Sequence, residues 1–172
     1  MKALILMAGL SLAVPTLAWP QETEHQYRAE AYAFAAYEAT LGAAGGGGGE
    51  VFLNKGFALG GEFVKAENPI GEYNGAFNMY YHFGASTDKR KVEPFVTGGY
   101  TWLYVPNVDL PHADGGNIGA GLNIWAFKHA ALRLELRDTI GGRDISIIYE
   151  SGGNYYAAPN NVVSFRIGVA FR

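Results

Sequence analysis

Residues 131–138 read ALRLELRD, a stretch in which leucine and charged side chains alternate. Successive side chains of a β-strand point to opposite faces, so a strand would place the leucines on one face and Arg133, Glu135 and Arg137 on the other. A helix would not gather the three charged side chains opposite the leucines. The alternation therefore predicts a β-strand with one apolar face and one charged face.

The same period of two recurs along most of the chain, which makes eight candidate strands in total. The other seven are residues 30–38, 45–53, 57–64, 72–83, 95–105, 117–125 and 161–171. An even number of strands suits an antiparallel up-and-down barrel, whose closure leaves no exposed sheet edge. The sequence therefore predicts an all-β fold with eight strands closed into one barrel.

The connections between these strands alternate in length. Two are short turns, at residues 54–56 and 127–130, and a charged turn at 85–93 lies at the same end. The connections between them are mostly longer and carry Pro, Gly, Asn and Asp, as loops do: they are residues 41–45, 66–71, 106–115 and 139–160. Short turns at one end and longer loops at the other are typical of bacterial outer-membrane barrels, in which the short turns are periplasmic.

The two faces of the strands differ in size, which indicates the direction in which each points. The interior of an eight-stranded barrel has little room beyond its own side chains, so bulky aromatic side chains from every strand would overfill it. The aromatic face is therefore predicted to point outward, into lipid. Its members are Tyr73, Phe77, Met79, Tyr81, Phe83, Trp102, Tyr104, Phe165 and Phe171.

The opposite face combines small residues with a few long charged side chains, which an interior would accommodate. An arginine that faces lipid at the bilayer midplane costs roughly 2–4 kcal/mol. Turned inward, the same side chain meets opposite charges. We therefore predict a salt-bridged plug in a transmembrane barrel, with Arg166 on the neighbouring strand and Glu62 across the lumen. The predicted network consists of Glu62, Arg133, Glu135, Arg137 and Arg166.

Other interpretations of the charged face are open to test. The charges would lie on a solvated face if the chain formed an ordinary sheet, and Glu135 with Arg133 would be a catalytic pair in an enzyme.

At the strand ends, aromatic side chains are predicted to form girdles at the two membrane interfaces. The candidates are Tyr81, Phe83, Trp125 and Phe127 on the periplasmic side, and Tyr37, Trp102 and Tyr104 on the outer side.

The first 18 residues have the pattern of a secretory signal peptide. A positive start is followed by an apolar run over residues 3–14, and Thr16 and Ala18 supply the small residues of a cleavage site. The run is too short to span a bilayer comfortably, which disfavours the alternative of an N-terminal membrane anchor. We therefore predict a signal peptide at 1–18 and a barrel domain at 19–172.

Composition excludes several classes of protein. An exported chain with no cysteine cannot be a disulfide-stapled fold, and a mean hydropathy of +0.00 is too low for a helical membrane protein. A formal net charge of −3 gives no reason to expect nucleic acid as a partner.

Taken together, the sequence resembles the small OmpA/OmpX-like eight-stranded outer-membrane β-barrel proteins of Gram-negative bacteria. The resemblance rests on residues 94–100 (PFVTGGY), 119–138 (GAGLNIWAFKHAALRLELRD) and 164–171 (SFRIGVAF). It implies outer-membrane lipid and lipopolysaccharide as surroundings, and recognition of the last strand by the barrel-assembly machinery. The residues that would form this assembly signal are Phe165, Ile167, Val169 and Phe171. Arg172 follows them, which departs from a terminal Phe.

No catalytic or metal-binding motif emerges from the sequence. Of the four histidines, only His112 falls in a predicted outer loop, where Asp109 or Asp114 would orient it and Ser151 would be the nucleophile. The glycine run at 45–49 lacks the Gly-Lys-Ser/Thr ending of a phosphate loop, and the loop aspartates match no calcium motif. We therefore predict no enzyme activity, no cofactor and no metal.

The predicted role is structural, or is a surface interaction through the outer loops with an unidentified ligand. Three alternatives differ in class: a secreted lipocalin-like barrel that binds an apolar ligand, a lipid A-modifying enzyme that uses His112, and a narrow porin for small solutes. The charged lumen disfavours the porin.

Overall fold

The computed structural model describes residues 29–39, 42–54, 56–67, 73–83, 91–104, 113–141, 148–151, 154–157 and 161–172. The predicted signal peptide lies outside these residues. Eight strands form the barrel: β1 (Ala29–Glu38), β2 (Gly42–Asn54), β3 (Phe57–Ala66), β4 (Tyr73–His82), β5 (Val92–Tyr104), β6 (Ala113–Trp125), β7 (Ala130–Gly141) and β10 (Asn161–Phe171).

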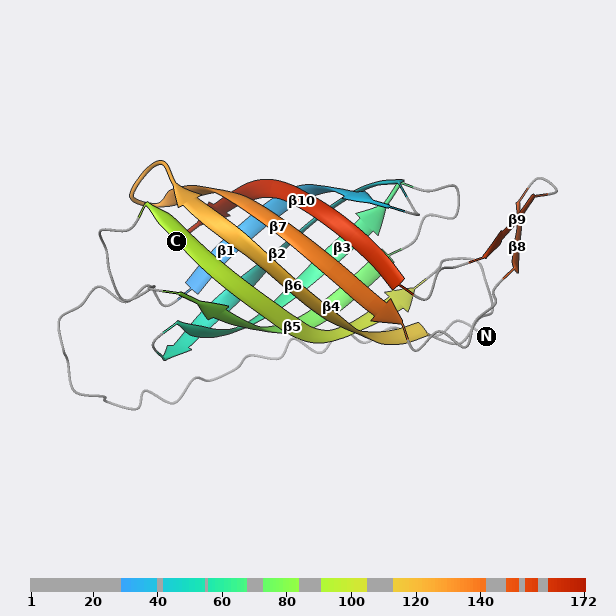
Figure 1. The fold of residues 1–172 in the computed structure, drawn as a ribbon, viewed down its shortest axis with the longest axis horizontal. Coiled ribbons are helices and arrows are strands. Elements are labelled where there is room, and N and C mark those ends of the chain that lie inside the picture. The colour runs from blue at the N-terminus through green and yellow to red at the C-terminus, as the bar shows by residue number, and fades with distance from the viewer. Residues whose placement is uncertain are drawn as a thin grey trace, which may run out of the picture.

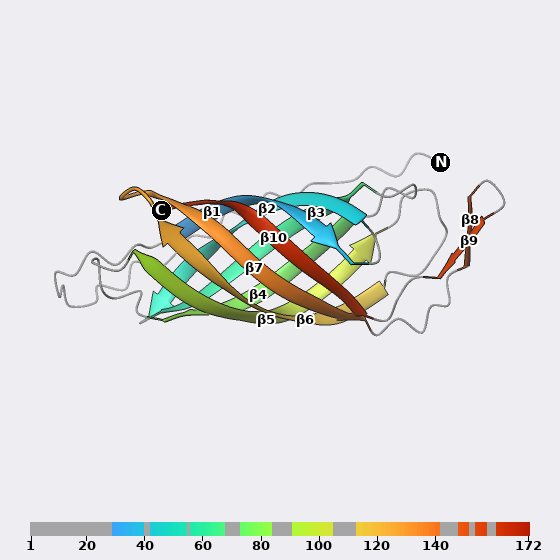
Figure 2. The same ribbon diagram turned by 45° about the horizontal axis from the view of Figure 1, so that its top comes forward.

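The barrel is closed and wholly antiparallel, with the strand order β1-β10-β7-β6-β5-β4-β3-β2. Each barrel strand pairs with the next one along the chain, and β1 pairs with β10 to complete the ring, from Ala31 opposite Phe171 to Glu38 opposite Ser164. The strands run obliquely around the barrel (Figures 1 and 2). The prediction of an eight-stranded antiparallel barrel is confirmed. The described part of the chain contains no helix long and apolar enough to cross a membrane.

A small hairpin lies where the sequence predicted only a loop at 139–160. Strand β7 continues to Gly141, and β8 (Ile148–Ser151) pairs with β9 (Asn154–Ala157) in a separate two-stranded sheet (Figure 1). Ser151 lies opposite Asn154, so two residues, Gly152-Gly153 in the sequence, separate the strands. A Gly-Gly pair between short runs that contain Ile and Tyr is a hairpin signal, but runs of four residues are too short for the alternation to mark them as strands.

The two ends of the barrel differ in their connections. At one end, here the turn rim, the strands join through residues 55–56, 83–91 and 126–129; at the other, the loop rim, they join through 39–41, 67–72, 105–112 and 142–160. Gly56 has a φ of 95°, and a Cβ at this position would collide with the carbonyl oxygen of His82. The tight β2–β3 hairpin therefore requires glycine at this position.

The outer wall carries exposed apolar side chains on all eight strands, and among them are the predicted Phe77, Met79, Trp102, Phe165 and Phe171. We call this surface the apolar belt. Its members are Tyr37, Val51, Leu53, Phe57, Phe63, Phe77, Met79, Val92, Val96, Tyr100, Trp102, Ile118, Leu122, Leu132, Leu136, Ile140, Val163, Phe165, Ile167, Val169 and Phe171. Polar and charged side chains occupy the alternate positions and are buried in the lumen.

One of the girdle predictions is wrong. Trp125 is only 7% exposed, and its ring lies against the guanidinium of Arg172, with 3.6 Å from the Arg172 Cζ to the ring centroid. Trp125 was assigned to the girdle because it lies at a strand end. It is two residues from the buried Asn123 on the same strand, so its side chain points into the lumen as well. Phe83 and Phe127 are exposed at the turn rim, whereas the side chain of Tyr104 lies outside the described residues.

The glycines of β2 alternate between the lumen side and the outer side of the barrel wall, and only some of them lie in tightly packed surroundings. A Cβ on Gly48 would lie 2.7 Å from the Tyr32 hydroxyl and 2.8 Å from the Glu62 Cβ, whereas a Cβ on Gly45 would meet only the Phe34 carbonyl oxygen, at 3.6 Å. We expect Gly48→Ala to lower the free energy of unfolding by about 1–3 kcal/mol through overpacking of the lumen. Gly45→Ala is the matched control and should be neutral or slightly stabilising. Equal effects in urea-unfolding curves would contradict this packing argument.

Candidate functional site

The lumen holds a concentration of buried charge that dominates the interior of the barrel. Ionised side chains removed from water are costly unless each finds an opposite charge and further hydrogen bonds. The arrangement of the partners therefore decides what the lumen can do. The acidic, basic and histidine side chains that are buried there are Glu30, Glu38, Glu50, Glu62, His82, Glu93, Arg133, Glu135, Arg137 and Arg166.

Glu62 of β3 is the centre of the cluster nearer the loop rim. Its Oε1 accepts a hydrogen bond from Nη1 of Arg137 at 2.6 Å and another from Nη1 of Arg166 at 2.8 Å. The hydroxyl of Tyr32 donates to Oε2 of the same carboxylate at 3.3 Å. One carboxylate thus holds two guanidinium groups that come from β7 and β10.

Glu135 connects this cluster with the rest of the lumen. Its Oε1 lies 2.5 Å from Nη2 of Arg137, and its Oε2 lies 3.6 Å from Nε of Arg133. Arg166 stands opposite Glu135 in the β10–β7 register, with Nη1 at 3.9 Å from Oε1. The five residues named in the sequence analysis are therefore all buried in the lumen, and ion pairs join all five.

Arg133 is the centre of a second cluster, nearer the turn rim. Its Nη1 donates to Oε1 of Glu30 at 3.1 Å and to Oε1 of Glu50 at 3.0 Å. Its guanidinium carbon also lies 4.2 Å from the ring centroid of Tyr32 and 4.1 Å from that of Phe95. Cation–π contacts of this kind are strongest where water is excluded. The charge of Arg133 therefore pairs with Glu30 and Glu50, and its planar guanidinium stacks against the rings of Tyr32 and Phe95.

His82 bridges two carboxylates next to this second cluster. Its Nε2 lies 2.9 Å from Oε2 of Glu50, and its Nδ1 lies 2.8 Å from Oε1 of Glu93. Two acceptor carboxylates match the two N–H donors of an imidazolium, since a neutral ring donates from one nitrogen only. Nη1 of Arg172 lies 3.3 Å from Oε2 of Glu93 and continues the network to the turn rim.

These contacts form one continuous series of opposite charges along the lumen, which we call the ion ladder. Its members in order from the turn rim are Arg172, Glu93, His82, Glu50, Arg133, Glu135, Arg137, Glu62 and Arg166. Near the loop rim, a cavity lined by Glu62, Arg137 and Arg166 has a volume of only about 20 Å³, which is room for about one water. The ladder thus runs through the described lumen as a series of paired charges, with Tyr32, Tyr80 and Phe95 buried beside it.

Sequence reasoning missed four of the nine ladder members, which are Arg172, Glu93, His82 and Glu50, and it also missed Glu30, which pairs with Arg133 beside the ladder. Glu50 and Glu93 lie near the turn-rim ends of β2 and β5, Glu30 near the same end of β1, and Arg172 follows β10. Residues 45–49 are all glycine, so no alternation of side chains there indicates whether Glu50 points into the lumen or outward. His82, by contrast, shares its face with Asn78 and Tyr80, so continuing the alternation would have placed it in the lumen.

The catalytic alternative involves residues that lie largely outside the described structure. His112, Asp109 and the side chain of Ser151 are not among the described parts, and Asp114 is exposed on β6. Within the described ranges, no group of three or more His, Cys, Asp or Glu side chains is arranged to hold a metal ion.

Comparison with known proteins relates this geometry to solved barrels. No family model and no curated protein sequence matches the chain. Among solved structures, the N-terminal β-barrel domain of Pseudomonas aeruginosa OprF is similar, with a TM-score of 0.63, 19% identity, and coverage of 83% of this chain and 95% of that one. A de novo designed transmembrane β-barrel gives a TM-score of 0.58 and 15% identity, covering 83% and 92%.

The outer membrane protein OprG from Pseudomonas aeruginosa is also similar, with a TM-score of 0.51, 11% identity, and coverage of 86% of this chain and 96% of that one. At these identities the likeness concerns architecture, and it agrees with the strand order and closure described above. The chain therefore has the closed eight-stranded antiparallel β-barrel fold that these solved barrels share.

Proposed function

We propose that the chain is an integral β-barrel of a bacterial outer membrane, exported through residues 1–18, with a structural or surface-interaction role. One observation carries the proposal: an apolar belt on every barrel strand surrounds a lumen of paired charges. A water-soluble barrel has the opposite arrangement, because contiguous exposed apolar surface of this extent is unfavourable in water. In lipid, a closed barrel also satisfies every backbone hydrogen bond between strands.

The fold comparison supports the location. The solved barrels with the same architecture include one described as a transmembrane design and one described as an outer membrane protein. The surroundings that we propose are outer-membrane lipid and lipopolysaccharide against the apolar belt. Surface ligands, if the chain has them, would meet the connections at the loop rim.

The exposed row on β10 suits recognition during insertion. Phe165, Ile167, Val169 and Phe171 are 46–53% exposed on the outer wall, so the row is accessible to the barrel-assembly machinery before lipid covers it. Arg172 turns away from this row toward Glu93 and Trp125. Arg172 thus contributes to the lumen and leaves the apolar row uninterrupted.

The ion ladder argues for a structural role over transport. A solute larger than water would have to displace ion pairs at 2.6–3.0 Å, each of which is desolvated. A lipocalin-like barrel requires an apolar cavity inside, whereas the described lumen holds Arg133 and Arg137 with their carboxylates. The ion ladder also leaves little open space in the described lumen for a small solute to pass, which disfavours a porin.

The proposal predicts the behaviour of the purified mature chain, residues 19–172. We expect it to require detergent, to migrate differently on SDS gels before and after boiling, and to give no conductance above baseline in planar bilayers. Heat modifiability tests the membrane barrel, and conductance tests the closed lumen. A freely water-soluble monomer would overturn the first part, and steady single-channel currents would overturn the second. Changed lipid A mass on expression, lost in His112→Ala, would favour the enzyme alternative.

A further inference from the structure

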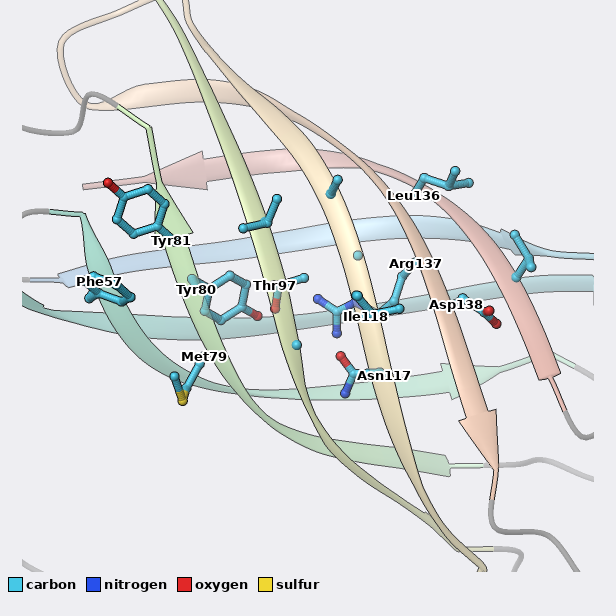
Figure 3. Close-up of a pocket in the computed structure, with 15 residues that line it drawn as sticks. Phe57, Met79, Tyr80, Tyr81, Thr97, Asn117, Ile118, Leu136, Arg137 and Asp138 are labelled. Atoms are coloured by element: carbon cyan, nitrogen blue, oxygen red, sulfur yellow. The ribbon is translucent and has the colours of Figure 1, made fainter.

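The outer wall contains a groove that crosses the apolar belt from β3 to β10, with a volume of about 770 Å³ (Figure 3). We call it the belt groove. It lies between two neighbouring rows of outward side chains that follow the strand register. The row nearer the turn rim is Phe57, Tyr81, Val96, Ala120 and Leu136, and the row nearer the loop rim is Met79, Gly98, Ile118, Asp138 and Val163.

The floor of the belt groove is backbone. Tyr80, Thr97 and Arg137 stand between the two rows and send their side chains into the lumen, where they are buried. Gly98 and Ala120 deepen the centre, because neither fills the space above the wall. A Cβ on Gly98 would meet only the carbonyl oxygen of Asn117, at 3.5 Å. The hollow is therefore a consequence of small residues on adjacent strands, framed by large apolar ones.

Asp138 is the one carboxylate on the two rows that frame the groove, where Tyr81 supplies a phenol hydroxyl. Its Oδ1 is buried and has no hydrogen-bond partner among the described residues. Its neighbours in the register are Ile118 and Val163, which are apolar. Protein atoms cover Oδ1, but the Asp138 side chain as a whole is only partly buried. A carboxylate between apolar neighbours is unfavourable without a donor, so its accessible side favours a ligand that brings an N–H or O–H group.

The groove has the shape of an extended chain. It spans five inter-strand steps, about 24 Å along the curved wall, and climbs from Phe57 at the start of β3 to Asp138, toward the loop-rim end of β7. Its volume falls within the roughly 300–1,000 Å³ of small-molecule sites, and a mostly apolar lining with a few polar groups, here Asp138 and Tyr81, is typical of such sites. An acyl chain fits the apolar length, and a polar head fits the Asp138 end.

We propose that the belt groove is a binding site for one membrane lipid, with an acyl chain along the groove and a headgroup N–H or O–H donor on Asp138. The inference rests on the proposed membrane location, since only there is the belt bathed in lipid. It goes beyond that location because it selects among lipids. A headgroup with an amine is favoured, and one without a donor is not.

Local lipid quenching tests this selectivity, and the absence of native cysteine allows single labels. A small fluorophore is attached at Gly116→Cys, which lies opposite Ile140 and two residues along β6 from the partner of Asp138, or at Gly45→Cys on β2, away from the groove and at a similar distance from the turn rim. The Cβ of either residue would make only contacts of 3.6 Å or longer. Each protein is reconstituted in vesicles that contain brominated phosphatidylethanolamine, which has an amine, or brominated phosphatidylcholine, which has no donor.

We expect phosphatidylethanolamine to be preferred about threefold at position 116, the size of one partly exposed charge-assisted contact, and not at position 45. Asp138→Leu should abolish the preference, and Ala120→Phe should abolish it by filling the groove. Equal preference at both positions, or a preference that survives Asp138→Leu, would overturn the site. If no brominated chain quenched either label and heat modifiability were absent, the membrane location itself would be wrong.

Discussion

Replacing Glu62 with alanine should destabilise the folded barrel by about 3–5 kcal/mol, because it removes one partner of a buried ionic cluster. Arg137 and Arg166 would each lose their hydrogen bond to Oε1, at 2.6 and 2.8 Å, and would face each other with only Glu135 between them. Equilibrium urea unfolding in lipid vesicles measures the change, and planar-bilayer recording shows whether the loosened lumen conducts.

Two controls isolate the electrostatic origin of this loss. Glu67→Ala removes an exposed carboxylate just beyond β3 and should change stability by less than about 0.5 kcal/mol. A triple variant, Glu62→Leu with Arg137→Met and Arg166→Met, should recover much of the loss, because apolar replacement of a whole buried cluster is often neutral. If Glu62→Ala changed stability as little as Glu67→Ala does, the claim that the ion pairs of Glu62 stabilise the barrel would be wrong.

Replacing Ile167 with arginine should cost about 2–4 kcal/mol, the cost of an arginine on the lipid face near the bilayer midplane. Ile167 lies in the middle of β10, 48% exposed, between Leu134 of β7 and Ala35 of β1. The measurement is again urea unfolding in vesicles. Ile167→Ala separates the loss of packing from the cost of the charge.

Depth along the strand gives the second control for this variant. Asn161→Arg places the same side chain at the loop-rim end of β10, where the expected cost is about 0–1 kcal/mol. Equal costs at positions 161 and 167 would contradict the assignment of the apolar belt to lipid. A cost for Ile167→Arg no greater than for Ile167→Ala would do the same.

The barrel was predictable where side chains alternate clearly. Residues 161–171 form β10 with the predicted bounds, because Val163 to Phe171 mark every second position. Strand β2 begins at Gly42, three residues before the predicted start, since glycine carries no side chain from which a face can be inferred. Alternation identifies faces within a strand, but strand ends depend on pairing with neighbours, which a single sequence does not display.

The lumen was only partly predictable for a related reason. Arg133, Glu135 and Arg137 alternate with leucines, so their face was evident from their own strand. Glu30 and Glu50 become lumenal only through the β1–β2 register, in which they lie opposite each other. Trp125 and Arg172 meet across strands β6 and β10, which the chain order does not bring together. Such contacts follow from closure of the ring, so they require the structure.

The ion ladder, together with Glu30 beside it, links segments that are far apart in the chain, and this has a consequence for biogenesis. Glu30 bonds Arg133 across 103 residues, and Glu62 bonds Arg166 across 104. Until the last strand docks on the first, a nascent barrel would carry arginines and glutamates whose counter-charges are not yet in place. Burial of those groups is favourable only once the ring is complete, so truncated intermediates should stay at the membrane surface, and insertion should be a concerted, all-or-none event.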